Sequence, residues 1–266
     1  MNNLNLKRFG VGEDKLVAIH GLGSASTAWE LVKPALSQRY EFITLDLPGH
    51  GAAKMRANKE MNPYYLSQLI KNELADNGIE TFHLMGNSLG GWIALEMAAQ
   101  FPSNVLSVTG VAPAGLWFTP KTHRNGELAI SRYMARSTYK LAYPIARMRF
   151  MRQIGFKLVS PQWEKLSIET CAEAAIAMGS ATGYYDLWDA FLGNRFDKPI
   201  SNEIPVTIIF GDSDYTLPES NSQEKTLAPS HSKWIKLSQS GHAPMWDQVE
   251  AVVEETIKTI ETFEAN

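Results

Sequence analysis

The clearest candidate for chemistry is Ser88, which lies in the run Gly86-Asn87-Ser88-Leu89-Gly90-Gly91. An apolar segment, 81–85, precedes this run, and a helical pattern follows it. A serine at such a joint is typical of a nucleophile held on a sharp, strained strand-to-helix turn. Gly86 and Gly90 would relieve crowding beside it, because glycine has no Cβ. The N-terminus of the following helix would favour negative charge that develops near Ser88.

A serine hydroxyl needs a base, a group that orients the base, and donors for the oxyanion before it attacks a carbonyl. Of the six histidines, His242 is the best placed base, because its loop follows the last predicted strand. Asp214 is the preferred acid, since it lies far enough past the penultimate strand to reach a neighbouring loop. Asp212 is expected to be a turn or capping carboxylate, and Asp247 the N-cap of the final helix.

The oxyanion donors are expected to be two backbone N–H groups. One belongs to Leu89, the residue after the nucleophile, and the other to Leu22, in the loop after an early strand. A phosphate loop at residues 21–23 is disfavoured, because the segment lacks both the third glycine of a dinucleotide fingerprint and the Gly-Lys-Ser/Thr of a P-loop. His20 is expected to be a structural ring bonded to backbone.

These residues need a scaffold of alternating strands and helices, which the apolar runs and turn signals predict. Strands are expected over 4–9, 15–20, 40–47, 81–85, 105–112, 206–210 and 233–237. Helices are expected over 28–36, 63–76, 89–101, 219–227 and 247–263. From 113 to about 200 the alternation gives way to aromatic-rich helical patterns. The sequence therefore predicts an α/β domain formed by 1–113 and 201–266, with a helical cap at 114–200.

Composition narrows the class of protein. The chain has 266 residues, 44% of them apolar, and a net charge of −3, so nucleic acid is not an expected partner. Cys171 is the single cysteine, which excludes an internal disulfide and fits a reducing compartment; it is expected to be a small buried residue. No signal-like segment and no apolar run of 18 residues is present, so we expect a cytoplasmic protein without a membrane partner.

The order Ser88, Asp214, His242 along the chain is that of α/β-hydrolases. Together with HGLG, DLPGHG, GNSLGG, GDSDYTLP and SGHAP, it makes the chain resemble the α/β-hydrolase superfamily everywhere except in the cap. The resemblance implies a mostly parallel, eight-stranded sheet with a lid inserted after the sixth strand, where Pro113 falls. It also implies that Ser88 is the nucleophile, Asp214 the acid and His242 the base, with Leu22 and Leu89 forming the oxyanion hole.

The resemblance also bears on the reaction. Dehalogenases and epoxide hydrolases of this superfamily carry aspartate at the elbow, whereas serine implies an acyl-enzyme. We therefore expect a hydrolase of carboxylic esters with small to medium acyl groups. Because the sequence shows no metal-ligand cluster and no cofactor fingerprint, we expect it to need neither metal nor cofactor. The alternatives are a hydrolase of C–C bonds in aromatic ring-cleavage products, a cofactor-free perhydrolase and a ligand receptor with little turnover. The C–C hydrolases usually have tryptophan after the catalytic histidine, and Ala243 stands there instead.

The cap has two further features. Residues 121–157 hold nine basic side chains and a single acid, Glu127. They form either a solvated helical face or a surface that steers an anionic substrate or an acidic acyl carrier. The cap aromatics are either lid core or the walls of an acyl pocket, and the candidates for the pocket are Trp117, Phe118, Trp163 and Trp188.

Overall fold

The computed structural model describes residues 4–55, 60–124 and 126–265. Within these residues a seven-stranded sheet has the order β1-β3-β2-β4-β5-β6-β7. β1 pairs with β3 in the antiparallel sense, and every other neighbouring pair is parallel. The strands are β1 (Lys7–Phe9), β2 (Lys15–Ile19), β3 (Glu41–Leu45), β4 (Phe82–Asn87), β5 (Val105–Val111), β6 (Val206–Gly211) and β7 (Lys233–Leu237).

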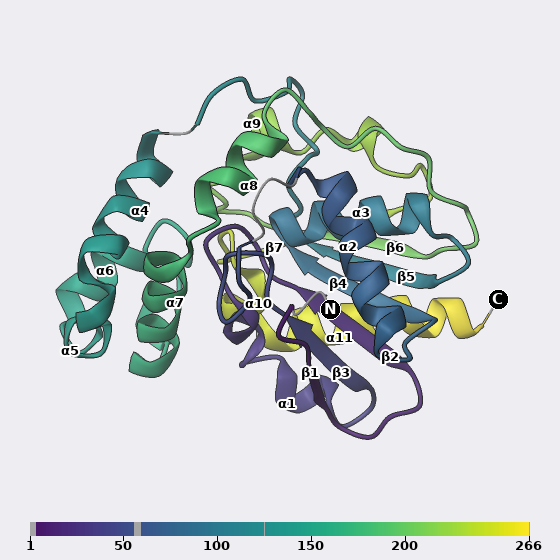
Figure 1. Ribbon diagram of the computed structural model, residues 1–266, viewed down its shortest axis with the longest axis horizontal. Helices are drawn as coiled ribbons and strands as arrows, with labels where there is room; N and C mark the ends of the chain where they lie inside the picture. Colours follow the sequence, from purple (N-terminus) through teal and green to yellow (C-terminus); the bar gives the residue numbers. More distant parts are fainter. Residues whose placement is uncertain (1–3, 56–59, 125, 266) are drawn as a thin grey trace.

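Helices cover both faces of this sheet (Figure 1). On one face α2 (Pro63–Asp76) and α3 (Leu89–Gln100) bury their apolar side chains against the strands. On the other, α1 (Lys33–Leu36) and α11 (Val249–Glu264) form a second apolar core. The central strands are therefore covered on both sides, which explains why they read as continuous apolar runs.

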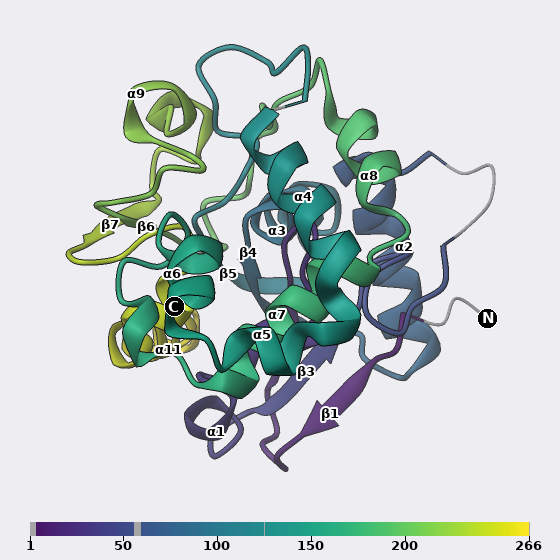
Figure 2. The ribbon, with the colours of Figure 1, turned by 90° about the vertical axis from the view of Figure 1, so that its left-hand side faces the viewer.

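A helical segment, residues 114–200, connects β5 to β6 and is named the inserted segment below. Its α-helices are α4 (Gly126–Thr138), α5 (Ala142–Ala146), α6 (Arg149–Phe156), α7 (Ile168–Ser180) and α8 (Tyr184–Phe191). No strand occurs among its described residues. In Figure 1 its helices α4, α5, α6 and α7 lie at one end of the molecule, and in Figure 2 these helices face the viewer. We propose that this segment is the cap expected from the sequence.

Several expectations need correction. The sheet has seven strands in the described residues rather than eight, so Pro113 follows the fifth strand. The expected helix 28–36 is a 3-10 turn (Ser26–Trp29) followed by α1, because Pro34 has no N–H with which to continue a helix through it. The expected helix 219–227 is α9 (Glu219–Ser222) followed by a 3-10 turn (Lys225–Leu227).

The closing helix also differs from its expectation. It is interrupted, with α10 (Pro244–Asp247) ending before α11 begins at Val249. Gln248 is the N-cap of α11, and its extended φ of −134° separates the two helices. Asp247 is therefore not the N-cap of the final helix.

Candidate active site

Ser88 occupies a strained turn between β4 and α3. Its backbone has φ 54° and ψ −118°, a conformation that residues with a Cβ rarely adopt. The turn is tight enough to exclude side chains on both flanking glycines. A Cβ on Gly90 would lie 2.0 Å from the carbonyl oxygen of Ile19, and one on Gly86 would lie 2.3 Å from that of Gly90. The glycines are needed because backbone fills the space that a side chain would occupy.

The turn presents Ser88 while burying the residues around it. Ser88 is partly exposed, and both Asn87 and Leu89 are buried. The Ser88 N–H donates to the Val111 carbonyl at 3.0 Å, and the Ser88 carbonyl accepts from the Ala114 N–H at 2.9 Å. These bonds fasten the turn to the end of β5, so the hydroxyl is held on a rigid backbone.

The expected acid and base are in contact. Nδ1 of His242 lies 2.9 Å from Oδ2 of Asp214, although the two residues are 28 positions apart. The other carboxylate oxygen of Asp214 accepts the N–H groups of Thr216 at 2.9 Å and Leu217 at 2.8 Å. Burial alone would raise the pKa of Asp214, but the His242 ring and these N–H donors lower it below its ordinary value. The carboxylate is therefore kept ionised beside the imidazole.

Asn87 connects this pair to the turn that bears Ser88. Its side-chain amide donates to the backbone carbonyl of His242 at 3.1 Å and to that of Val111 at 3.0 Å. The sequence analysis assigned Asn87 no role. The available signal was a polar side chain at the end of an otherwise apolar strand, since buried amides need partners.

The loop after β2 lies directly against Ser88. A Cβ on Gly21 would be 3.0 Å from the Cβ of Ser88, which places the backbone of Gly21 and Leu22 next to the serine. Leu89, on the other side, is the first residue of α3 and so has an N–H outside the helical hydrogen-bond ladder. Both expected oxyanion donors therefore belong to backbone that borders Ser88.

Two buried histidines hold this loop in place, and neither faces the expected triad. The Leu47 N–H donates to Nε2 of His20 at 2.9 Å, and the Gly23 N–H donates to Nε2 of His50 at 3.1 Å. Each Nε2 must be unprotonated to accept a hydrogen bond, so each ring carries its proton on Nδ1. From there His20 donates to the Gly21 carbonyl, and His50 donates to the Pro48 carbonyl. Burial lowers the pKa of His50 to about 3 and also lowers that of His20.

The two competing aspartates have structural partners. Asp212 accepts the N–H groups of Gln239 and Ser240 at 3.1 and 3.3 Å, as expected of a turn carboxylate. Asp247 is buried under the His242 loop, where it accepts the Gly241 N–H at 2.8 Å and the Ser160 hydroxyl. Burial raises the pKa of Asp247. Its function in the fold is to join the His242 loop to the inserted segment.

The four aromatic pocket candidates are not gathered in one place. Trp117 and Trp188 are buried and both pack against Phe191, with ring centroids 6.0 and 5.9 Å away. Trp163 is buried in a separate cluster inside the inserted segment, and Phe118 is exposed. Two other side chains of the inserted segment lie against the loop after β2. Met178 and Tyr184 are the side chains that a Cβ on Gly23 would meet.

Other reactive groups lie apart from this site. Cys171 is fully buried, and burial raises the pKa of its thiol to about 11, so it is protonated at neutral pH. In the described ranges, no group of histidine, cysteine and carboxylate side chains is arranged to hold a metal ion. None of the helices described there is both long and apolar enough to cross a bilayer.

Comparison with known proteins agrees with this architecture. The model of the alpha/beta hydrolase fold family matches residues 15–249. A pimeloyl-[acyl-carrier protein] methyl ester esterase from Aeromonas hydrophila is 36% identical over 110 residues, which are 41% of this chain and 41% of that one. This chain thus spans less than half of that relative.

Solved structures extend the likeness in fold to the whole chain. A bacterial membrane phospholipase A superposes with a TM-score of 0.75 and 23% identity, covering 100% of this chain and 86% of that one. A meta-cleavage product hydrolase from Pseudomonas fluorescens superposes with a TM-score of 0.70 and 18% identity, covering 98% of this chain and 94% of that one. With the family model matching most of its length, the chain belongs to the α/β-hydrolase family.

Proposed function

We propose that the protein hydrolyses carboxylic esters of small to medium acyl groups through an acyl-serine intermediate at Ser88. The observation that carries this proposal is the buried Asp214–His242 pair, joined to the serine-bearing turn by Asn87. A histidine whose Nδ1 is bonded to a carboxylate has Nε2 left to act as the base. No other described part of the chain combines a partly exposed serine on a strained turn with such a pair.

In the first half of the reaction the Ser88 oxygen attacks the ester carbonyl while Nε2 of His242 takes the hydroxyl proton. The carbonyl oxygen becomes an oxyanion, and the N–H groups of Leu22 and Leu89 would stabilise it. The C–O bond to the alcohol then breaks, and His242 returns its proton to the departing alkoxide. Asp214 fixes the ring tautomer and stabilises the transient imidazolium.

In the second half a water molecule replaces the alcohol. His242 removes a proton from the water, the hydroxide attacks the acyl carbonyl, and the bond to the Ser88 oxygen breaks with return of the proton to that oxygen. The products are a carboxylic acid and free enzyme. Every proton transfer uses this chain's own groups.

The test is hydrolysis of p-nitrophenyl esters of graded chain length by the wild type and by Ser88→Ala. We expect the variant to lose several orders of magnitude in kcat, because only oxyanion and binding effects remain when a triad member is absent. Turnover that survives the substitution would contradict the proposal. A ring-cleavage dienoate assayed in parallel distinguishes the C–C hydrolase alternative. A protein that is labelled by a fluorophosphonate but does not turn over the esters repeatedly would instead be a ligand receptor.

A further inference from the structure

Over residues 130–134, helix α4 has the opposite burial pattern to an ordinary surface helix. It buries Arg132, which is 2% exposed, and leaves Ile130, Tyr133 and Met134 at 63%, 73% and 45% exposed. These three residues have the spacing i, i+3 and i+4, so they form one stripe along the helix. A helix of a globular protein normally turns such a stripe to the core and its charged residues to water. The apolar face of α4 has no partner in the described structure.

A second apolar stripe runs along α6. Phe150 and Ile154 are exposed one turn apart on α6, and Leu158, which is also exposed, lies in the turn just after the helix. The opposite side of the helix is packed, with the ring of Phe156 6.3 Å from that of Trp246. Both views show α4, α5 and α6 on the same outer side of the molecule (Figures 1 and 2). Ten of the 13 large hydrophobic residues exposed in the described ranges lie in 118–158, so this exposure is concentrated on one side.

Basic side chains are interspersed with these stripes. Arg124 and Arg149 form ion pairs with Asp189 and Glu164. The other basic residues on the outer side have no ion pair with any described residue; they are Arg136, Lys140, Arg147 and Lys157. The surface therefore combines unpaired positive charge with exposed aliphatic and aromatic groups.

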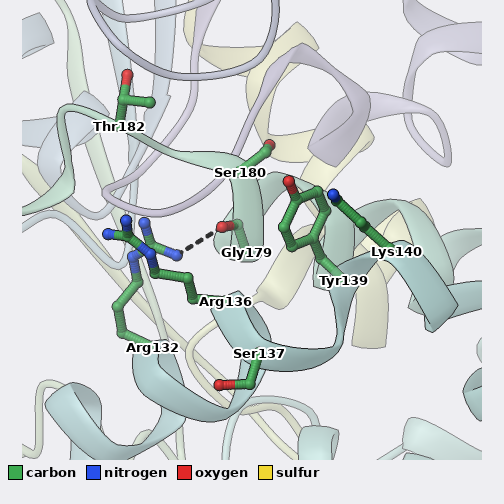
Figure 3. Close-up of a pocket in the computed structure, with 8 residues that line it drawn as sticks. All are labelled: Arg132, Arg136, Ser137, Tyr139, Lys140, Gly179, Ser180 and Thr182. Atoms are coloured by element: carbon green, nitrogen blue, oxygen red, sulfur yellow. Dashed lines mark hydrogen bonds between the residues drawn. The ribbon is translucent and has the colours of Figure 1, made fainter.

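Part of this charge surrounds a pocket between α4 and the end of α7 (Figure 3). The pocket has a volume of about 560 Å³ and is lined by the cations Arg132, Arg136 and Lys140. Hydroxyl groups add to the lining, from Ser137, Tyr139, Ser180 and Thr182. Figure 3 shows both arginine side chains extending from α4 toward the end of α7, where Arg132 donates to the Gly179 carbonyl. No carboxylate contributes to the lining, so the pocket suits an anion.

Arg132 also stabilises the fold through hydrogen bonds, and one of its N–H donors remains unpaired among the described residues. Its Nη1 and Nη2 groups donate to the carbonyls of Met178, Gly179 and Ala181, at the C-terminus of α7. Its buried Nε–H has no hydrogen-bond partner among the described residues. Burial and the neighbouring charge of Arg136 lower the pKa of Arg132. The Arg132 guanidinium is therefore committed to the fold, and the exposed cations beside the pocket are Arg136 and Lys140.

We propose that the outer side of α4–α6 docks onto an anionic lipid surface, with its exposed cations Arg136, Lys140, Arg147 and Lys157 against the lipid phosphates. Large apolar side chains would enter the boundary between headgroups and acyl chains, while arginine and lysine reach the phosphates. A lipid surface fits better than a protein partner, because the apolar groups form convex stripes on two helices separated by cations. This attachment is peripheral and departs from the sequence-based expectation of no membrane partner. It does not depend on the chemistry at Ser88.

The test is co-sedimentation with phosphatidylcholine vesicles that contain 30% phosphatidylglycerol, against vesicles of phosphatidylcholine alone. We expect binding to the anionic vesicles only, weakened by salt. Phe150→Ser/Ile154→Ser and Arg136→Gln/Lys140→Gln should each weaken the partitioning at least tenfold. The matched control is Lys7→Gln/Tyr64→Ser, which removes an exposed cation and an exposed aromatic from the α/β domain and should bind as the wild type does.

The proposal would be overturned if the protein bound both kinds of vesicle equally or bound neither. It would also be overturned if the two double variants of α4–α6 bound as well as the control variant. So would a dimer, seen by light scattering, that Phe150→Ser/Ile154→Ser dissociates, since a second copy would then cover the face. If one double variant does not fold, the other still decides the matter. Ser88→Ala should bind vesicles like the wild type, so failure of the proposed reaction and failure of docking are separate results.

Discussion

The side-chain amide of Asn87 donates to the backbone carbonyl of His242 at 3.1 Å, across 155 positions of sequence. This bond joins the turn that carries the serine to the loop that carries the imidazole. Parallel strands bring these loops to the same edge of the sheet, but neighbouring strand ends alone do not fix the position of a ring. The Asn87 amide supplies a direct link between the two.

Asn87→Ala should therefore reduce kcat on the order of 10²-fold with little change in KM, because misplacement of a catalytic group by about 1 Å costs that much. It should also lower the free energy of unfolding by about 1–3 kcal/mol, because the His242 carbonyl loses this donor while the Val111 carbonyl keeps only the Ser88 N–H. Kinetics on a p-nitrophenyl ester and urea denaturation measure the two effects. Asn104→Ala is the matched control, because its amide donates to the Glu80 carbonyl at the opposite ends of the strands. Equal kcat in the two variants would contradict a positioning role.

Asp214 and Asp212 allow a direct comparison of two aspartates in one loop. Asp214→Asn should lower kcat by about 10⁴-fold, because an amide at this place favours the wrong tautomer of His242. Asp212→Asn should stay within a few-fold of the wild type, since Asp212 accepts hydrogen bonds from the N–H groups of Gln239 and Ser240 and from the Ser213 hydroxyl rather than from His242. Steady-state kinetics of the two variants decide the assignment. A larger loss in the Asp212 variant would reverse it.

The buried ring of His50 should make stability depend on pH. Its pKa is about 3 in the folded chain against an ordinary 6.5, so below pH 6.5 the unfolded chain binds a proton that the folded chain does not. The free energy of unfolding should then fall as the pH drops from 6.5 toward 3, by about 1.4 kcal/mol per pH unit for this group. At pH 7 the His50 ring is neutral in both the folded and the unfolded chain, so this loss of unfolding free energy is absent.

His50→Gln removes that contribution. We expect its loss of stability between pH 7 and pH 5 to be about 2 kcal/mol smaller than that of the wild type. His123→Gln, which changes an exposed ring, should keep the wild-type difference. Denaturant titrations at the two pH values provide the comparison. Identical differences in all three proteins would show that protonation of His50 is not linked to unfolding.

Sequence patterns predicted the strands well for a physical reason. A buried parallel strand must be apolar on both faces, and the apolar runs expected at 15–20, 40–47, 81–85, 105–112 and 206–210 correspond to the buried strands β2 to β6. The expected acid and base were also recognisable, because turn residues after strands mark the edge where ligands bind. The structure brings Asp214 and His242 into contact as expected.

Other features depend on contacts that local patterns do not encode. The environment of Asp247 is formed by Ser160 and Gly241, and the partner of Asn87 is 155 residues away. The inverted burial of α4 follows from the carbonyls at the end of α7, which receive Arg132. Periodicity alone would have placed the apolar stripe of α4 in the core.

The most direct test of the account is to trap the acyl-enzyme. The protein is mixed with a p-nitrophenyl ester, quenched in acid within milliseconds, digested and analysed by mass spectrometry. We predict that the acyl mass is found on the peptide containing Ser88, in a burst equal to the enzyme concentration. An acyl group on another residue, or turnover without any acylated peptide, would contradict the claim that Ser88 is the nucleophile.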